Sequence, residues 1–246
     1  MIESIVLEFK NQLKEHDPHL PIDKKNRMYK ILNSSNPKFE SYGIKISEIE
    51  KIVREIHKKY PCSYEDALEV FKELIRSNNH EENFSAVFFL NRFKKYFSED
   101  TINIFSDQFF KYCDSWAICD RTMIRVIGPF LGKNGNEELA LNIIAKWSNS
   151  KDMWVRRASM VILLKLVMLR KDFDEDYVFS LAEKMSSFSE DYIQKGIGWL
   201  LKTCSKYKPE VIFQYLMKNK TSLSRLVLRY ASEKLSKEKR TEILNK

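Results

Sequence analysis

The sequence contains few of the residues that interrupt regular secondary structure. Its 246 residues include only 6 Gly and 6 Pro, which leaves little turn material for a sheet of many strands. No apolar run approaches the roughly 20 residues of a membrane-crossing helix. Acids lie inside the apolar pattern of residues 1–17, and no small-residue cleavage site follows, so this segment predicts a helix and not a signal peptide. We therefore expect long helices joined by short polar loops.

Cysteine and histidine are also scarce, and neither is clustered. The chain has 4 Cys and 4 His, without the Cys-x-x-Cys or His-x-x-x-His spacing that would group ligands around a zinc ion. We expect no metal ion and no cofactor. The cysteines are interpreted as reduced core residues of an intracellular protein, and they are Cys62, Cys113, Cys119 and Cys204.

Positive charge is concentrated at the carboxyl end of the chain. The net charge is +8; residues 195–246 hold 13 Lys and Arg against 4 Asp and Glu, whereas residues 1–194 hold 29 against 30. A folded basic segment favours a polyanionic partner, because each neutralised phosphate releases condensed counterions. A basic, solvated tail that keeps the protein in solution is the alternative.

Apolar residues recur at helical spacing almost from end to end. Ser63 and Asp66 have the spacing of a capping box, which predicts that a helix begins there. No strand-like alternation competes, so the predicted fold class is all-α. Helices are expected at about 2–13, 46–56, 63–74, 82–97, 101–113, 116–131, 136–148, 152–169, 175–186, 190–206, 209–218, 222–235 and 237–244.

Five of these segments resemble one another when they are aligned. Each has a polar or basic start, then small and apolar residues; they begin at Asn83, Asp120, Val155, Ile193 and Leu223, and the first four are separated by about 35–38 residues. Helical pairs at this period indicate HEAT-like repeats. Such pairs stack into a superhelical solenoid, and their second helices would line a concave basic face. We expect a single domain over residues 1–246.

One candidate site lies in the expected helix at 116–131. Trp116, Asp120, Met123, Ile124 and Ile127 share a face by helical spacing. A carboxylate in an apolar stripe must be hydrogen-bonded, be paired with a cation, or face a cavity. Asp120 is therefore either a functional acid or part of a structural ion pair.

A second candidate lies at the start of the expected helix at 152–169. Arg156 and Arg157 are adjacent there, and an Arg at the start of a second helix can bind a phosphate through two hydrogen bonds. Arg157 could equally be the partner of Asp120. Trp154 is followed at helical spacing by Ala158, Val161 and Ile162, so it is interpreted as a core residue.

The third candidate is a stripe on the expected helix at 190–206. Lys195, Trp199, Lys202 and Lys206 follow one another at helical spacing. A large aromatic side chain among lysines suits a surface that contacts a nucleic-acid sugar or base. A tryptophan covered by the lysine stems is the alternative.

These three sites also resemble a known family, the AlkD-type DNA glycosylases, which release alkylated purines. The resemblance covers about Asn83 to the carboxyl end, with one further motif nearer the amino terminus. Five motifs carry it: YGIK at Tyr42–Lys45, SWAICD at Ser115–Asp120, WVRRAS at Trp154–Ser159, DYIQKGIGWLLKTCSKYKPEV at Asp191–Val211 and LSRLVLRYASEKL at Leu223–Leu235.

The resemblance implies a role for several of these residues. Asp120 would face the scissile glycosidic bond, Trp116 and Trp199 would pack against the deoxyribose of the damaged nucleotide, and Arg157 would contact the backbone. Tyr29 is the candidate for a further aromatic contact. The chain departs from the family's pattern beside the signature tryptophan. Ser115 stands where a second Trp is expected, and Ala117 stands where an acid is expected.

The resemblance further implies an enzyme that leaves the lesion stacked in duplex DNA, with the carboxylate stabilising an oxocarbenium-like sugar. Arg156, Arg157, Lys195, Lys202 and Lys206 would bind the DNA. We expect a monomeric protein in the cytoplasm, associated with the nucleoid, whose partner is double-stranded DNA with alkylated bases and not a membrane. Two alternatives remain, a non-catalytic HEAT-repeat protein that binds branched or damaged DNA and a protein-interaction scaffold.

Overall fold

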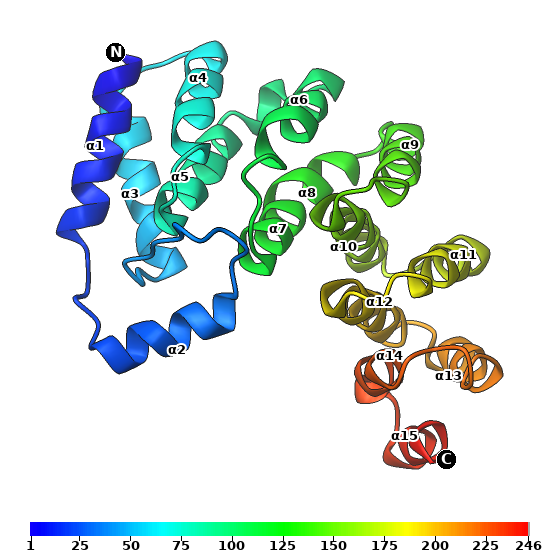
Figure 1. The fold of residues 1–246 in the computed structure, drawn as a ribbon. Coiled ribbons are helices and arrows are strands. Elements are labelled where there is room, and N and C mark those ends of the chain that lie inside the picture. The colour runs from blue at the N-terminus through cyan, green and yellow to red at the C-terminus, as the bar shows by residue number, and fades with distance from the viewer. Residues whose placement is uncertain (246) are drawn as a thin grey trace. The chain divides into compact units, whose positions relative to one another are not determined.

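The computed structural model describes residues 1–245, and within them it is built of helices joined by short loops (Figure 1). The all-α prediction is confirmed. The one backbone pairing of strand type among these residues is an isolated parallel bridge between Glu40 and Asn79. The chain divides into two compact units, Met1–Thr122 and Met123–Lys246, which are described separately. The expectation of one continuous domain therefore stays a prediction.

The first unit has a core of four helices and a short continuation. Phe9 of α1 and Phe89 of α5 meet edge to face with ring centroids 5.3 Å apart. Every residue of α5 from His80 to Leu90 is buried, as expected for a helix that is surrounded by others. The elements are α1 (Ile2–Glu15), α2 (Ile22–Leu32), α3 (Ile46–Lys59), α4 (Tyr64–Ile75), α5 (His80–Asn91), α6 (Glu99–Ile104), a π-helical turn (Phe105–Phe109) and α7 (Trp116–Thr122).

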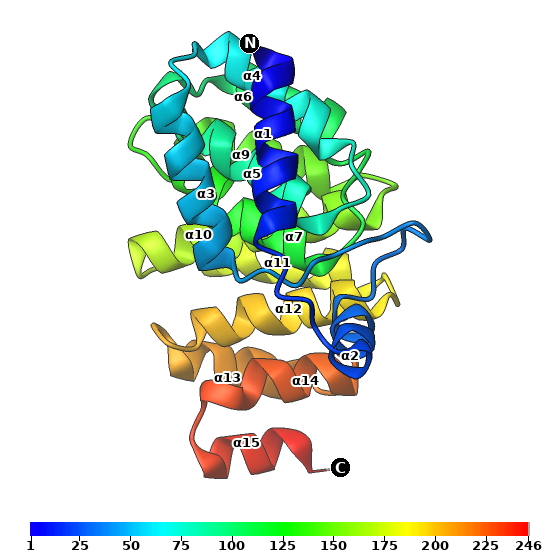
Figure 2. The same cartoon turned by 90° about the vertical axis from the view of Figure 1, so that its left-hand side faces the viewer.

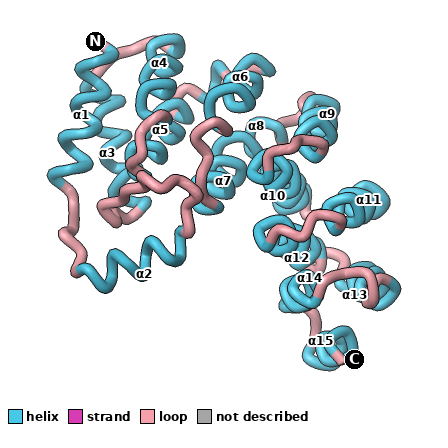
Figure 3. The backbone as a smooth tube through the Cα atoms, in the orientation of Figure 1, coloured by secondary structure: helices cyan, strands magenta, loops and turns pink. Residues whose placement is uncertain are grey.

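Helix α2 has no buried residue, which explains why no apolar stripe predicted it. It lies apart from α1, α3, α4 and α5, and long loops precede and follow it (Figures 2 and 3). Four of its eleven residues are Lys or Arg, and Ile22 and Ile31 are exposed. Helix α2 therefore has no buried apolar face of its own that would hold it to the rest of the unit.

The predicted capping box at the start of α4 is confirmed. The Ser63 amide donates to the Asp66 carboxylate at 2.9 Å, and the Asp66 amide donates to the Ser63 hydroxyl at 3.1 Å. Two of the amides that a helix start leaves unpaired are thus satisfied. Helix α5 begins two residues earlier than expected because Asn79 caps it, accepting from the amides of Glu81 and Glu82.

The second unit contains the repeated helical pairs. The first helices, α9, α11 and α13, lie on one side, and the second helices, α10, α12 and α14, lie on the other (Figure 1). The elements are a π-helical turn (Met123–Ile127), α8 (Gly128–Leu131), α9 (Glu137–Ser148), α10 (Met153–Arg170), α11 (Glu175–Ser186), α12 (Asp191–Cys204), α13 (Pro209–Lys218), α14 (Arg225–Ala231) and α15 (Lys237–Leu244).

The polar start of the second helices, seen in the aligned segments, has a structural function in three of them. The fourth residue of α5, α10 and α12 is Asn83, Arg156 and Gln194, and each donates to backbone carbonyls at or just after the end of the preceding helix. Carbonyls at and beyond a helix end have no α-helical N–H partner. We call this arrangement the repeat clamp, since it closes each helical pair.

Most expected helix bounds agree with the structure to within two residues. The largest differences are at the carboxyl ends: α5 ends at Asn91 instead of 97, α6 ends at Ile104 and continues as a π turn, and α14 ends at Ala231. In each case a tighter or wider turn replaces the last turns of the expected α-helix. Among the described residues, no helix combines the length and apolar character needed to cross a membrane.

Candidate functional site

Helix α7 holds the candidate acid, Asp120, in a buried position. Asp120 is 7% exposed and lies one turn after Trp116, which is half-buried. The i, i+4 spacing places the two side chains on the same face of the helix. A buried carboxylate opposes positive charge far more strongly than a solvated one, because water no longer screens it. This is the property that a group facing a developing cation requires.

Trp116 is tied to the carboxyl end of α2. Its indole Nε1 donates to the Ile31 carbonyl at 3.0 Å. That carbonyl belongs to the last turn of α2, where helix carbonyls have no helical partner. The Trp116 ring is thereby fixed in orientation while part of it remains exposed.

A second set of bonds fixes the loop after α2 beside the start of α7. The Ser34 hydroxyl donates to the Asp114 carboxylate at 2.7 Å, and the Ser35 amide donates to the Asp114 carbonyl at 2.9 Å. Burial raises the pKa of the Asp114 carboxyl above its ordinary value, against the bonds that lower it. The sequence did not identify Asp114 as a positioning residue, because its partners lie about 80 residues earlier in the chain.

Tyr29, the remaining aromatic candidate, lies on α2. Its hydroxyl accepts from the Ser41 amide at 3.2 Å, and its ring contacts Phe39 with centroids 5.5 Å apart. Both partners belong to the loop between α2 and α3. Tyr29 is therefore a residue of α2, and Trp116 is hydrogen-bonded to the carboxyl end of the same helix.

The YGIK motif binds this loop to the core through one carboxylate. Glu81, which is 1% exposed, accepts from the Ser41 hydroxyl at 2.7 Å and from the amides of Tyr42, Gly43 and Ile44 at 2.8–3.2 Å. Gly43 has φ +85°, a conformation that side-chain-bearing residues rarely adopt. The motif is thus a structural element that holds the loop after α2.

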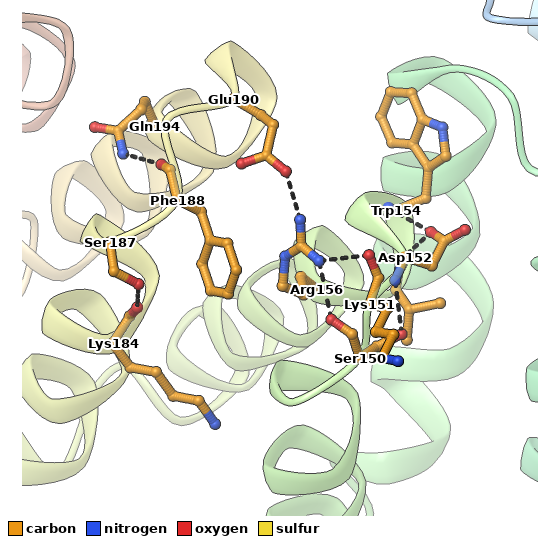
Figure 4. A network of polar contacts seen from close by, with 11 residues as sticks. Ser150, Lys151, Asp152, Trp154, Arg156, Lys184, Ser187, Phe188, Glu190 and Gln194 are labelled. Carbon is orange, nitrogen blue, oxygen red and sulfur yellow. Dashed lines mark hydrogen bonds and ion pairs between the residues drawn. The ribbon is translucent and has the colours of Figure 1, made fainter.

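The two adjacent arginines of α10 are both buried, at 4% and 5% exposed. Arg156 donates to the carbonyls of Ser150 and Lys151 at 2.9 and 2.7 Å and pairs with Glu190 at 2.5 Å (Figure 4). Its guanidinium also lies over the Phe188 ring, 4.1 Å from the centroid. These contacts give Arg156 a structural function, and its contact with DNA stays a prediction.

Arg157 also contacts the following repeat. Its guanidinium donates to the Tyr192 carbonyl and lies 5.9 Å from the centre of the Tyr192 ring. Trp154, the predicted core residue, is 6% exposed and packs on the same ring with centroids 5.0 Å apart. The core interpretation of Trp154 is confirmed. The predicted backbone contact of Arg157 stays a prediction.

The predicted lysine and tryptophan stripe, in contrast, reaches the solvent, and all of it except Lys206 lies on α12, which ends at Cys204. Lys195 and Trp199 are half-buried, and Lys206 is exposed. Lys195 lies 3.5 Å from the Asp191 carboxylate, and Lys202 is paired with Glu233 in the turn after α14. Lys206 makes no ion pair with any described residue, so it can neutralise an external anion without breaking one.

The opposite face of α12 forms the core that the sequence predicted. Ile193, Ile197, Leu200 and Cys204 are each 0% exposed. Burial raises the pKa of the Cys204 thiol to about 12, so this thiol stays protonated and unreactive near neutral pH. Across residues 1–245, no group of three or more His, Cys, Asp or Glu is placed to hold a metal ion.

Comparison with known proteins assigns the chain to a family. A family model for DNA alkylation repair enzymes matches residues 13–235. No curated protein matches the chain. A solved structure, described as a predicted DNA alkylation repair enzyme from Enterococcus faecalis, has the same fold with a TM-score of 0.73; it is 21% identical, over 88% of this chain and 96% of that chain.

Proposed function

Because the chain belongs to the family of DNA alkylation repair enzymes, we propose that it is a DNA glycosylase for N3- and N7-alkylated purines in duplex DNA. The observation that carries the proposal is the buried Asp120, one turn after the half-exposed Trp116. The two residues have the spacing of the family's signature helix. A role in alkylation repair follows from the family itself.

Alkylated purines of this kind are already cationic, so the base leaves without being protonated. The bond between C1′ and the base nitrogen breaks, and its electron pair makes the departing base neutral. The sugar acquires oxocarbenium character, as in glycoside hydrolysis. The Asp120 carboxylate opposes this charge, and a water oxygen then bonds to C1′ and releases its proton to solvent.

Trp116 contributes an aromatic face at the deoxyribose, and the family resemblance implies the same role for Trp199. An aromatic face attracts a cation within about 6 Å of its centre, so a ring beside the sugar stabilises the positive charge as it moves from the purine to the sugar in the transition state. The bond from Trp116 to the Ile31 carbonyl keeps its ring in one orientation. The family resemblance implies that the lesion remains stacked in the duplex while the protein contacts the sugar and the backbone, unlike in base-flipping glycosylases.

Duplex DNA binds through the α12 stripe. Lys206 has the greatest freedom to reach a phosphate, since Lys202 is paired with Glu233 and Lys195 with Asp191, the latter at 3.5 Å. Phosphate contacts position the protein without reading the sequence, which suits an enzyme that must act at lesions anywhere in the genome. We expect it to act as a monomer in the cytoplasm, on the nucleoid.

The test is release of 7-methylguanine from methylated duplex DNA, measured by chromatography of the freed base under single-turnover conditions. Release above the rate of the DNA alone supports the glycosylase. No release, together with binding to the same duplex, would contradict it and would favour the second candidate, a non-catalytic protein that binds branched or damaged DNA. Ser115 and Ala117, which depart from the family's pattern beside Trp116, favour that second candidate.

A further inference from the structure

A groove of about 760 Å³ lies between α11 and α13, the first helices of two adjacent repeats in the second unit. Figure 1 shows these helices on the side of the unit away from α12 and α14. Its volume is in the range of small-ligand sites. None of the residues of the proposed catalytic or DNA-binding surfaces lines it, so the function proposed above leaves it unexplained.

The lining of the groove is acidic, although this part of the chain is basic. Glu175, Asp176, Glu183 and Glu210 line it, against one cation, Lys218. Glu175 and Glu210 are paired with Lys208 and Lys239. Asp176 and Glu183 make no ion pair with any described residue, and their spacing places them on one face of α11. A cation entering the groove would find two carboxylates available.

Two aromatic residues that line the groove stack on each other between the helices. Phe179 of α11 and Tyr215 of α13 stack with centroids 4.0 Å apart and an interplanar angle of 6°. Tyr215 is 6% exposed, whereas Phe179 is half-buried. The exposed part of Phe179, flanked by Asp176 and Glu183, is suited to a guanidinium or ammonium group.

The Tyr215 hydroxyl is a second, independent feature of this groove. It is buried and has no hydrogen-bond partner within residues 1–245. A buried donor without a partner is uncommon in proteins and costs free energy. Burial, together with the nearby charge of Glu183, raises the pKa of this phenol to about 12, so it stays a donor near neutral pH. A ligand that brings an acceptor would satisfy it.

We propose that the groove between α11 and α13 binds a cationic peptide segment of a partner protein. The carboxylates exclude an anionic ligand such as nucleic acid. A protonated polyamine would satisfy the carboxylates but offers no acceptor to the Tyr215 hydroxyl, whereas a peptide carries a carbonyl at every residue. Its Lys or Arg side chains pair with Asp176 and Glu183, and one of its carbonyls accepts from Tyr215.

The test uses the full chain and a fluorescein-labelled, end-capped hexapeptide of alternating Arg and Ser, followed by fluorescence anisotropy. The matched probe replaces each Arg by Glu. The cationic peptide should bind, and the acidic one should not. D176N/E183Q should weaken binding about tenfold or more, in line with double-mutant cycles for charge pairs at interfaces. The control D107N/E138Q makes the same charge change at exposed positions outside the groove and should bind like the unmodified protein.

Tyr215→Phe is the variant that separates recognition from folding. It removes only the hydroxyl, so the melting temperature should stay the same or rise, while peptide affinity falls about fivefold, the effect of one neutral hydrogen bond. Equal binding of both peptides, or binding that ignores D176N/E183Q, would overturn the proposal. Spermidine that binds as tightly as the peptide and ignores Tyr215→Phe would also overturn it, in favour of a polyamine site. Release of 7-methylguanine should be unaffected by these variants, so the two proposals fail separately.

Discussion

Tryptophan and basic side chains occur together at the start of α10 and along α12, both in the second unit. At the start of α10, Trp154, Arg156 and Arg157 are 4–6% exposed. Along α12, Lys195 and Trp199 are half-buried, and Lys206, in the turn that follows the helix, is exposed. Both sets combine a tryptophan with cationic side chains, arginines in the first and lysines in the second, but only the second set presents its charge to solvent.

The difference depends on which acceptors the chain itself supplies. Arg156 lies where two loop carbonyls and the Glu190 carboxylate converge (Figure 4), so its donors stabilise the junction between repeats. On α12, Lys195 and Lys202 have single carboxylate partners, whereas Lys206, in the turn after α12, makes no ion pair with any described residue. A basic residue at the start of a repeat helix is therefore evidence for DNA binding only when its donors are not already used.

The largest expected contrast is between two tryptophan truncations. Trp154→Ala should lower the free energy of unfolding by about 3–5 kcal/mol, as for other buried aromatic side chains. Trp199→Ala should cost clearly less stability and should weaken DNA binding about tenfold, consistent with the loss of one aromatic stacking contact. Denaturant unfolding and duplex-binding titrations measure both. An equal loss of stability in the two variants would place Trp199 in the core and would contradict its assignment to the DNA-binding surface.

Arg156→Ala tests the repeat clamp. The free energy of unfolding should fall by about 3 kcal/mol, because the change leaves the Ser150 and Lys151 carbonyls and Glu190 without their donor. Arg170→Ala, at an exposed position on the same helix, is the matched control and should change stability by less than about 0.5 kcal/mol. If Arg156→Ala kept full stability but lost DNA affinity, Arg156 would belong with the α12 stripe.

The lysines of the stripe should determine the salt dependence of DNA binding. The double variant K195Q/K206Q should flatten the log–log slope of affinity against salt by up to about 2, since each phosphate contact contributes about 0.9. K146Q/K218Q, which changes two exposed lysines on α9 and α13, should leave the slope unchanged. Identical slopes in the two variants would show that the salt dependence of DNA binding follows the total positive charge of the protein and not the position of these lysines.

The smallest expected effect extends the comparison to Trp116. Trp116→Phe keeps an aromatic ring but removes the donor to the Ile31 carbonyl. The loss of one such bond corresponds to about 1 kcal/mol, so amide hydrogen exchange in α2 should become roughly fivefold faster while exchange in α5 stays the same. Unchanged exchange in α2 would mean that the bonds at Asp114 alone hold this helix.

The sequence predicted the elements with a buried stripe and missed the one without. Helices α3, α4 and α12 have strong apolar faces, and their bounds were close; α2 has no buried residue, so periodicity could not indicate it. The polar starts of the second helices were recognised as a pattern, but their function was not. Their acceptors lie at or just after the end of the preceding helix and, for Arg156, also at Glu190 of the next repeat, which only the folded chain brings together.

In the candidate site, the sequence predicted the arrangement of residues within one helix but not the contacts between distant segments. Spacing placed Trp116 and Asp120 on one face and the lysines of α12 on another, because both arguments concern a single helix. The bonds from Asp114 to Ser34 and Ser35 and from Trp116 to Ile31 join segments about 80 residues apart. Nothing in either segment alone indicates the other.

Asp120→Asn tests directly whether this carboxylate stabilises the transition state. The substitution is nearly isosteric and removes the charge proposed to oppose the oxocarbenium ion. We expect the single-turnover rate of 7-methylguanine release to fall about 100- to 1,000-fold, the usual effect of losing one such electrostatic group. DNA affinity and melting temperature should remain those of the unmodified protein. An unchanged rate would contradict the catalytic role, and a melting temperature many degrees lower with an unchanged rate per folded molecule would assign Asp120 to a structural ion pair instead.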